Sequence, residues 1–320
     1  MELPNYRVLP VGDDAPPRSS WGLWGSHDVF GCLNLLSAEK VTEAARLVRT
    51  GKVFALNWAM ELPDPPLFGR SPLSHTVIKE GPWQDEELTL WNTQTSSQWD
   101  GFRHVRSADY GYYGGVPNGE HGIHHWARKG IVGRGVLVDL ARYRRSVGRP
   151  LSMSDPDPIT AQELADAITS SPVTVGPGDI LLLRTGWIEW YVSLRSDERS
   201  ELSKNLRAPG LRPGKDLLEV VWDLHIAAIA ADNPSVEVYP PQPAPAIKRS
   251  NTVGGRQDES DLFSHFALLP LLGLPLGELF DLSSLAEDCA ADGIYEGFFT
   301  SAPLNLRGGV ASPPNALVIK

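Results

Sequence analysis

Short apolar segments separated by polar turns run along the chain, and their periods predict both helices and strands. A helix is predicted to begin after Ser37, a typical N-cap residue, and to end before Gly51. The apolar residues of that segment share one face: Val41, Ala44, Ala45 and Val48. The stretches 160–163 and 284–287 have the spacing of capping boxes, which predicts two further helix starts.

Four short runs of β-branched residues and leucine predict buried strands, and they cover residues 136–140, 180–184, 226–230 and 317–319. Their spacing is irregular, and helices and Pro-rich loops such as 239–246 lie between them, so a mixed α/β fold is favoured over a repeat or a strict βα alternation. No linker divides the chain, which predicts a single domain over residues 1–320. Residues 1–20 lack apolar periodicity and are interpreted as an N-terminal arm that could wrap a neighbour.

Composition narrows the classes of function. Hydrophobic residues make up 42% of the chain and charged residues 21%, which is typical of a folded globular protein. The formal net charge of -10, without a basic cluster, argues against nucleic-acid binding. The longest apolar run, 266–276, contains two prolines and is shorter than the roughly 20 residues that a membrane span needs.

The ends and the cysteines of the sequence give two weaker indications. The first residues lack the basic and apolar pattern of a secretory signal, so cytoplasmic localisation is expected. Only Cys32 and Cys289 are present, which excludes a disulfide framework and a Cys-rich zinc site and predicts two inert thiols, with a disulfide between them as the alternative.

The segment over residues 94–104 carries the polar side chains best suited to chemistry. In an extended chain Gln98 and Asp100 point to the same side, and Gly101 permits the bend that returns His104 toward them. Gln94 has to approach through a curved loop, because the hydroxyl and β-branched residues that follow it disfavour a helix. The pattern Gln-x3-Gln-x-Asp-x3-His therefore predicts convergent side chains, although such residues are also common on solvated loops.

This segment resembles the pattern His-x3-His-x-Asp-x3-His of the cyclase-like family of kynurenine formamidase and isatin hydrolase, in which the first three residues bind a metal. Further stretches resemble the same family along nearly the whole chain: Trp21-Gly22, 31–36, 133–137, 178–187, Pro303-Leu304 and Gly308-Gly309. The resemblance implies that Gln94, Gln98, Asp100 and His265 bind a metal ion. It also implies a catalytic role for Glu278, which together with His265 resembles the late His and Glu of the family.

Both family histidines are glutamines in this chain, and this exchange affects the expected metal. An amide oxygen is a harder and weaker metal ligand than an imidazole. The exchange should therefore lower the affinity for zinc and favour manganese as the bound divalent ion. The trans-dienelactone hydrolases resemble this chain in having Gln-x3-Gln and remain metal-dependent, which implies an adapted site. A cation on Asp100 would activate water and polarise a carbonyl, and His104 would act as the catalytic acid and base.

Other candidate residues have simpler readings. His121 and His124 could share a helical face as ligands, but a cluster at a helix start that lines a pocket is the preferred interpretation. Asp232 and Asn233 follow a predicted strand, where α/β folds often place site residues, and a turn before Pro234 is an equal alternative.

The resemblance implies a swivelling β/β/α fold, with a barrel-like strand core surrounded by helices, in a homodimer or homotetramer. The expected function is metal-dependent hydrolysis of a small cyclic amide, lactone or related acyl compound. A catalytically silent member that binds a small ligand and a metal-dependent lyase remain as alternatives.

Overall fold

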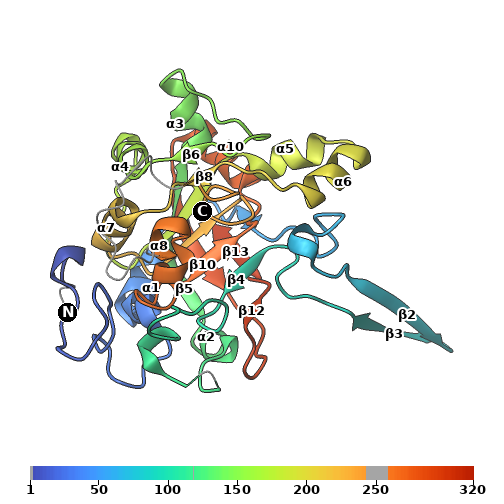
Figure 1. Cartoon of the computed structure of the whole chain (residues 1–320). Coiled ribbons are helices and arrows are strands. Elements are labelled where there is room, and N and C mark those ends of the chain that lie inside the picture. The colour runs from blue at the N-terminus through green and yellow to red at the C-terminus, as the bar shows by residue number, and fades with distance from the viewer. Residues whose placement is uncertain (1–2, 118, 243–258) are drawn as a thin grey trace.

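The computed structural model describes residues 3–117, 119–242 and 259–320, and a curled nine-stranded sheet surrounded by helices forms its centre (Figure 1). The sheet is a half-barrel of mixed α/β architecture, as the sequence predicts. Its strands run in the order β1 (Val53–Ala55), β13 (Ala316–Ile319), β11 (Glu296–Ser301), β5 (Ile131–Asp139), β7 (Ile180–Arg184), β9 (Ala228–Ala231), β10 (Leu276–Glu278), β4 (Gln98–Asp100) and β12 (Ala311–Ser312). Strands β5, β7, β9 and β10 are parallel, and the outer pairs are antiparallel.

Helices cover this sheet, and two small sheets lie beside it. The α-helices are α1 (Ala38–Ala45), α2 (Ile123–Lys129), α3 (Leu140–Ser146), α4 (Ala161–Ser170), α5 (Trp187–Ser193), α6 (Ser196–Lys204), α7 (Lys215–Asp223), α8 (Glu259–Leu262), α9 (His265–Leu268) and α10 (Ser283–Asp292). Short 3-10 helices are η1 (Tyr6–Val8), η2 (Gly31–Leu35), η3 (Leu67–Gly69) and η4 (Tyr113–Gly115). The small sheets pair β2 (Ser74–Glu80) with β3 (Trp83–Thr89) and β6 (Pro158–Ile159) with β8 (Gly210–Leu211).

The predicted strands are present, with shifts at their ends. Strand β7 has the predicted bounds, and β13 begins one residue before the predicted 317. Strand β5 begins five residues before the predicted 136 and stops at Asp139, because that side chain accepts from Arg142 N and starts α3. Strand β9 is Ala228–Ala231 rather than 226–230. The central strands are apolar and buried on both faces, which is typical of parallel strands between helices.

The helix starts are predicted better than the helix ends. Ser37 caps α1 through Lys40 N, but the helix ends at Ala45, well before Gly51, because the following N–H groups bond to carbonyls three residues back in the tighter 3-10 pattern. Thr160 and Glu163 form the predicted capping box of α4. The box predicted at 284–287 is wrong.

A different residue starts that last helix. The N-cap of α10 is Leu282, without a side-chain hydrogen bond, and the helix already begins at Ser283. Asp281 Oδ1 accepts from Ser283 N at 3.1 Å, which satisfies one donor of the first turn. Ser284 is exposed within the helix and has no capping role.

The described part of the N-terminal segment lies against its own chain. Tyr6 N donates to Asp223 Oδ1 at 2.7 Å, and Trp222 Nε1 donates to Pro4 O at 2.8 Å. Cys32 and Cys289 are buried and free, and burial raises the pKa of Cys289 to about 11, so both thiols are inert as predicted. No helix within the described ranges has the length and apolar character to cross a membrane. The predicted loop 239–246 lies partly outside the described residues.

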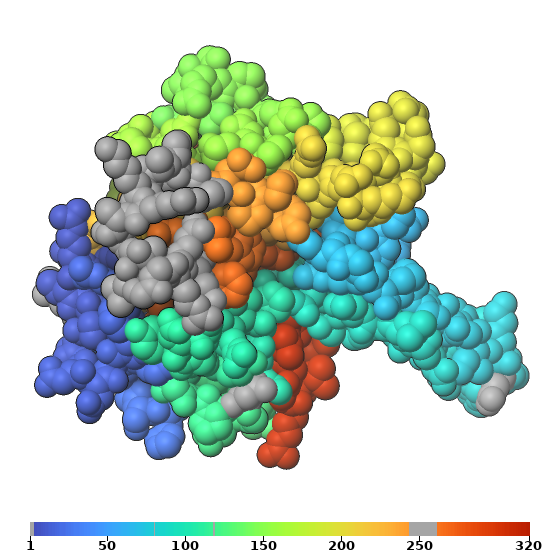
Figure 2. Space-filling view, in the orientation of Figure 1, coloured from blue at the N-terminus to red at the C-terminus, as the bar shows by residue number. Residues whose placement is uncertain are grey.

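One hairpin departs from the compact arrangement. Strands β2 and β3 pair with each other and project from the body of the molecule (Figures 1 and 2). Every residue of β3 is exposed.

Replacing Thr160 by Ala should lower the free energy of unfolding by about 1 kcal/mol, because the capping box of α4 loses one of its two hydrogen bonds. The matched change Ser284→Ala should alter the free energy of unfolding by less than about 0.5 kcal/mol, because the exposed side chain caps nothing. Urea unfolding of both variants measures the difference. Equal losses in the two variants would contradict this account of the helix starts.

Candidate metal centre

Strands β4 and β10 place three of the site residues. They pair antiparallel, with Glu278 opposite Gln98, so both side chains project toward the same face. Asp100 lies two residues after Gln98 and shares that face, and Gln98 Nε2 lies 3.3 Å from Asp100 Oδ1. Trp99 points the other way into the core, where its indole N–H donates to Ser301 Oγ at 2.9 Å. The alternation of an extended strand thus separates the polar side chains from the core, as the sequence predicts.

A tight turn after β4 brings His104 back to the site. Gly101 N donates to Val310 O at 3.0 Å, and a Cβ at this position would lie only 2.6 Å from that oxygen, so the close approach of the two chains requires glycine. His104 N donates to Gly101 O at 2.8 Å and closes the turn. The side chain of His104 then lies with Nε2 3.9 Å from Asp100 Oδ2.

The first residue of α9, His265, is fixed by a carboxylate from a distant loop. Glu237 accepts hydrogen bonds from Ser264 N at 2.5 Å and from His265 N at 3.0 Å, and it accepts a third from His265 Nδ1 at 2.5 Å. The ring of Phe263 stacks on the imidazole with centroids 4.3 Å apart. Together these contacts turn Nε2 of His265 toward the sheet. A carboxylate that orients a histidine from behind is common at metal sites.

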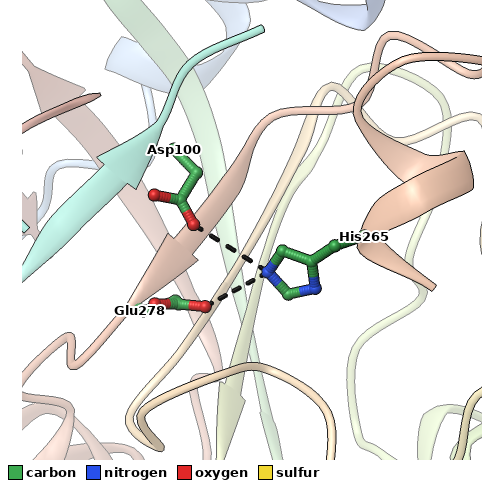
Figure 3. A group of neighbouring side chains, drawn as sticks. All are labelled: Asp100, His265 and Glu278. Atoms are coloured by element: carbon green, nitrogen blue, oxygen red, sulfur yellow. Dashed lines mark hydrogen bonds and ion pairs between the residues drawn. The ribbon is translucent and has the colours of Figure 1, made fainter. Parts of the chain in front are cut away.

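Asp100, His265 and Glu278 meet in the interior and point toward one another (Figure 3). His265 Nε2 lies 3.8 Å from Asp100 Oδ2 and 3.2 Å from Glu278 Oε1, and one ligand atom from each residue lies within 4.8 Å of the others. All three side chains are buried. Asp100 Oδ2 is buried without a hydrogen-bond partner, which is costly for a carboxylate oxygen.

The pKa values show how these groups respond to burial. Burial raises the pKa of Glu278 to about 7, and the nearby Asp100 adds to the shift. Burial alone would lower the pKa of His265, but its hydrogen bonds to Glu237 and Glu278 outweigh that effect and raise the pKa to about 10. In the metal-free protein the imidazolium of His265 therefore compensates part of the negative charge.

The spacing of the three ligand atoms fits a bound divalent cation. Ligand atoms about 2.1 Å from a tetrahedral metal lie about 3.4 Å from each other. The distances of 3.2 and 3.8 Å around His265 Nε2 bracket that value. Two carboxylates and one imidazole suit manganese as well as zinc. The unpaired Asp100 Oδ2 is the atom for which a cation would supply the missing partner.

Gln94 and Gln98 border this group through their amide nitrogens. Gln98 Nε2 donates to Glu278 Oε2 at 2.7 Å, whereas its Oε1 lies 3.5 Å from Arg70 Nη1. Gln94 Nε2 lies 2.9 Å from His104 Nδ1 and 3.5 Å from Asp100 Oδ1. In this arrangement the two amides donate to the acidic cluster, and ligation through their oxygens would require each amide to turn over. Their predicted role as ligands stays a prediction.

The structure separates the other candidate residues from this centre. His121 is buried and its Nε2 donates to Tyr113 O at 2.8 Å, and His124 Nδ1 accepts from Gly308 N at 3.2 Å near the start of α2. Asp232 follows β9, and its carboxylate accepts from Thr185 N, Thr185 Oγ1 and Gly186 N at 2.7 Å each. These five hydrogen bonds hold loops and helix starts in place.

Two residues of the centre were missed from the sequence. Glu237 lies between Val236 and Val238, and a carboxylate in such an apolar run is a signal that it has a buried partner. Arg70 donates to Gln94 O and lies beside Gln98, and nothing in the surrounding sequence marks it as part of the site.

Comparison with known proteins identifies the family. The model of the Cyclase family matches residues 49–238. A crystal structure described as a novel cyclase is 30% identical, with a TM-score of 0.76, and the match covers 94% of this chain and 99% of that one. An isatin hydrolase bound to the product analogue thioisatinate is 14% identical, with a TM-score of 0.55 and coverage of 89% of this chain and 100% of that one. Isatin hydrolase A from Ralstonia solanacearum is 15% identical, with a TM-score of 0.53 and coverage of 84% and 92%.

The two isatin hydrolases show likeness of fold alone. No curated protein matches the chain. The family model covers more than half of the 320 residues, and the 30% identical structure covers nearly all of them. The chain therefore belongs to the Cyclase family.

Proposed function

We propose that this protein is a metal-dependent hydrolase that opens a small cyclic amide or lactone, or cleaves a related acyl compound, with activated water. The observation that carries the proposal is the buried group of Asp100, His265 and Glu278, in which one carboxylate oxygen lacks a hydrogen-bond partner. Buried charges of this kind are found mainly where they are paired or coordinate a metal.

Within this proposal Asp100, His265 and Glu278 hold the cation. The sequence assigned Glu278 a catalytic role, but its Oε1 faces His265 Nε2 inside the group, a position that supports ligation. Glu237 acts behind His265 and fixes its orientation, so that Nε2 remains directed at the cation. Gln98 donates to Glu278 and keeps that carboxylate in place.

His104 is suited to proton transfer. It is the most accessible member of the group, with 28% of its side chain exposed, whereas Asp100 is fully enclosed. Burial lowers the pKa of His104 below its ordinary value, although Asp100 opposes the shift, so the ring is neutral near pH 7. Its Nδ1 accepts from Gln94 Nε2 at 2.9 Å, so the neutral ring carries its proton on Nε2. When the Gln94 amide turns over, its oxygen accepts from Nδ1–H and Nε2 becomes the atom that takes a proton. A bound divalent cation supplies Lewis acidity toward a carbonyl and lowers the pKa of water.

The substrate class rests on likeness. The motif resembles that of kynurenine formamidase and isatin hydrolase, and two proteins of the same fold are described as isatin hydrolases. A metal-dependent lyase and a silent binding protein share much of the same machinery, and the measurements below separate them from a hydrolase.

Replacing His265 by Gln should weaken the affinity for Mn²⁺ and Zn²⁺ by more than about 100-fold, since loss of a ligand costs more than loss of the groups behind it. The matched control is His121→Gln, because His121 is equally buried, with 1% exposed, and lies outside the group. Isothermal titration of metal into both variants measures the difference. Equal affinity in the two variants would show that the cation binds elsewhere.

Replacing His104 by Ala should lower kcat by about 10²- to 10⁴-fold, as expected for loss of a general acid and base, while the metal content stays unchanged. His125→Ala serves as the control, because His125 Nε2 bonds to Glu120 O away from the centre. Turnover of a panel of cyclic amides and lactones, with metal analysis of each preparation, provides the measurement. Unchanged kcat in the His104 variant would remove it from the mechanism.

The mass of the product identifies the class of reaction. Hydrolytic ring opening gives one product heavier than its substrate by one water, and cleavage of an acyclic acyl compound gives two products whose masses sum to substrate plus water. Chelation should abolish their formation until Mn²⁺ or Zn²⁺ is restored. A product formed by elimination would replace the hydrolase by a lyase. Retention of unchanged ligand across the panel would favour the silent binding protein.

A further inference from the structure

One half-buried arginine, Arg70, lies at the edge of the candidate metal centre without a carboxylate partner. Its Nη1 donates to Gln94 O and lies 3.5 Å from Gln98 Oε1. In the part of the chain that the structure describes, Arg70 forms no ion pair, and its Nε and Nη2 donate no hydrogen bond. The edge of the guanidinium formed by Nε and Nη2 is therefore open to a ligand.

Three other arginines show how this fold uses a guanidinium for structure. Each of them forms ion pairs with two carboxylates of the chain, and they are Arg134, Arg144 and Arg184. A partly buried charge is costly unless such partners compensate it. Arg70 differs because the described residues supply no such pair, which favours a role in binding over a role in stability.

The positive charge of Arg70 acts on the acidic residues of the centre without contacting them. Burial raises the pKa of Glu278, and Arg70 opposes that shift. Burial lowers the pKa of His104, and Arg70 adds to that shift. A bound divalent cation would balance the charges of Asp100 and Glu278 by itself. With the cation in place, the guanidinium is available to an anion that comes from solution.

An aromatic ring holds the guanidinium in a defined plane. Arg70 Cζ lies 4.9 Å from the centroid of the Phe68 ring, and the edge of that ring meets Tyr239 with centroids 5.3 Å apart. Phe68 has a φ of 57°, which is costly for a residue with a side chain and is often found where a loop contacts a ligand. Phe68 is still 40% exposed, so apolar surface lies beside the open edge of Arg70.

We propose that Arg70 binds a carboxylate group of the substrate, so that the enzyme acts on cyclic amides or lactones that carry a carboxylate. The planar guanidinium matches a carboxylate with two parallel hydrogen bonds. This inference rests on the proposed function for the reaction, whereas binding of the carboxylate needs no turnover.

The position of Arg70 suits a substrate that contacts the guanidinium and the cation together. The amide of Gln98 separates the two: its Oε1 lies 3.5 Å from Arg70 Nη1, and its Nε2 donates to Glu278 Oε2 at 2.7 Å. One amide is comparable in size to a small ring with a single substituent. A carboxylate held by Arg70 would therefore orient the ring and select the carbonyl that faces the cation.

The test measures binding of two ring ketones, which cannot be hydrolysed. An oxocyclopentanecarboxylate presents both a ring carbonyl and a carboxylate, and a methylcyclopentanone with its methyl group at the same ring position lacks the charge. Isothermal titration of each ketone into the Zn²⁺-loaded protein gives the two dissociation constants. The native protein should bind the carboxylate at least about tenfold more tightly than the neutral ketone.

Replacing Arg70 by Met should raise the dissociation constant of the carboxylate by about 10- to 100-fold, because the charged hydrogen bonds are lost. Arg70→Lys keeps the charge without the planar fork, so its dissociation constant should lie between those of the native protein and Arg70→Met. Arg142→Met is the control, because Arg142 is exposed on α3, and it should bind like the native protein. Titration with Mn²⁺ shows whether each variant retains the metal centre.

Each remaining outcome is informative. Equal affinity of the native protein for the two ketones, failure to bind the carboxylate, or unchanged affinity in Arg70→Met overturns the role of Arg70. Loss of Mn²⁺ affinity in Arg70→Met also overturns it, because Arg70 would then support the metal centre itself. Failure of the proposed function is seen separately, as an absence of hydrolysis across the panel of amides and lactones while Arg70 still binds the carboxylate.

Discussion

Two carboxylates and an imidazole lie close together in the buried interior of this protein, and the surrounding strands fix their positions. Asp100 and Glu278 come from neighbouring antiparallel strands, and the register of β4 with β10 brings them onto one face. That register depends on Gly277, where a Cβ would lie 2.7 Å from Ala230 Cβ and from the ring of Phe280. The same strand register therefore determines both the face that carries the carboxylates and the face that packs into the core.

The polar contacts behind this group explain how like charges coexist at such a short distance. Glu237 accepts a hydrogen bond from the imidazole of His265. The pKa of His265 is raised to about 10, so the ring is protonated and places a positive charge between the carboxylates. Gln98 donates to Glu278, so that carboxylate is satisfied on its other oxygen. Asp100 Oδ2 is left without a donor. Every other side chain of this group has a hydrogen-bond partner, and only this one carboxylate oxygen lacks one. A bound cation would provide that partner, whereas a purely structural ion pair would leave the oxygen buried and unsatisfied.

Local sequence patterns predict the elements whose stabilising contacts lie within a few residues of one another. Strand β7 and the capping box at Thr160 are formed within a few residues, and both match the prediction. The start of α10 was predicted wrongly because the helix already begins at Ser283, where Asp281 accepts from Ser283 N, so Ser284 lies inside the helix and caps nothing. The end of α1 was placed too late because the change to 3-10 hydrogen bonds after Ala45 does not alter the spacing of the apolar residues.

The site residues, too, fall into those that local sequence patterns predict and those that they do not. Asp100 and His104 lie in one short segment, where strand alternation and a turn are enough to predict their convergence. Glu237 and Arg70 reach the centre through tertiary contacts with residues 28 positions away in each case, and no local period records such contacts. The resemblance to a family named His265 and Glu278, but it could not reveal the carboxylate behind the histidine.

The hairpin of β2 and β3 connects the metal centre to the surface of the molecule. Arg70 precedes this hairpin and Gln94 follows it, and the guanidinium of Arg70 donates to Gln94 O across the base of the hairpin. The same Arg70 lies 3.5 Å from Gln98 Oε1, and Gln94 Nε2 reaches His104 Nδ1 at 2.9 Å. Both ends of the projecting hairpin are thus tied to side chains that line the acidic group. The contact of Arg70 with Gln94 that closes the base of the hairpin therefore also positions the two amides, which in turn contact His104 and Glu278.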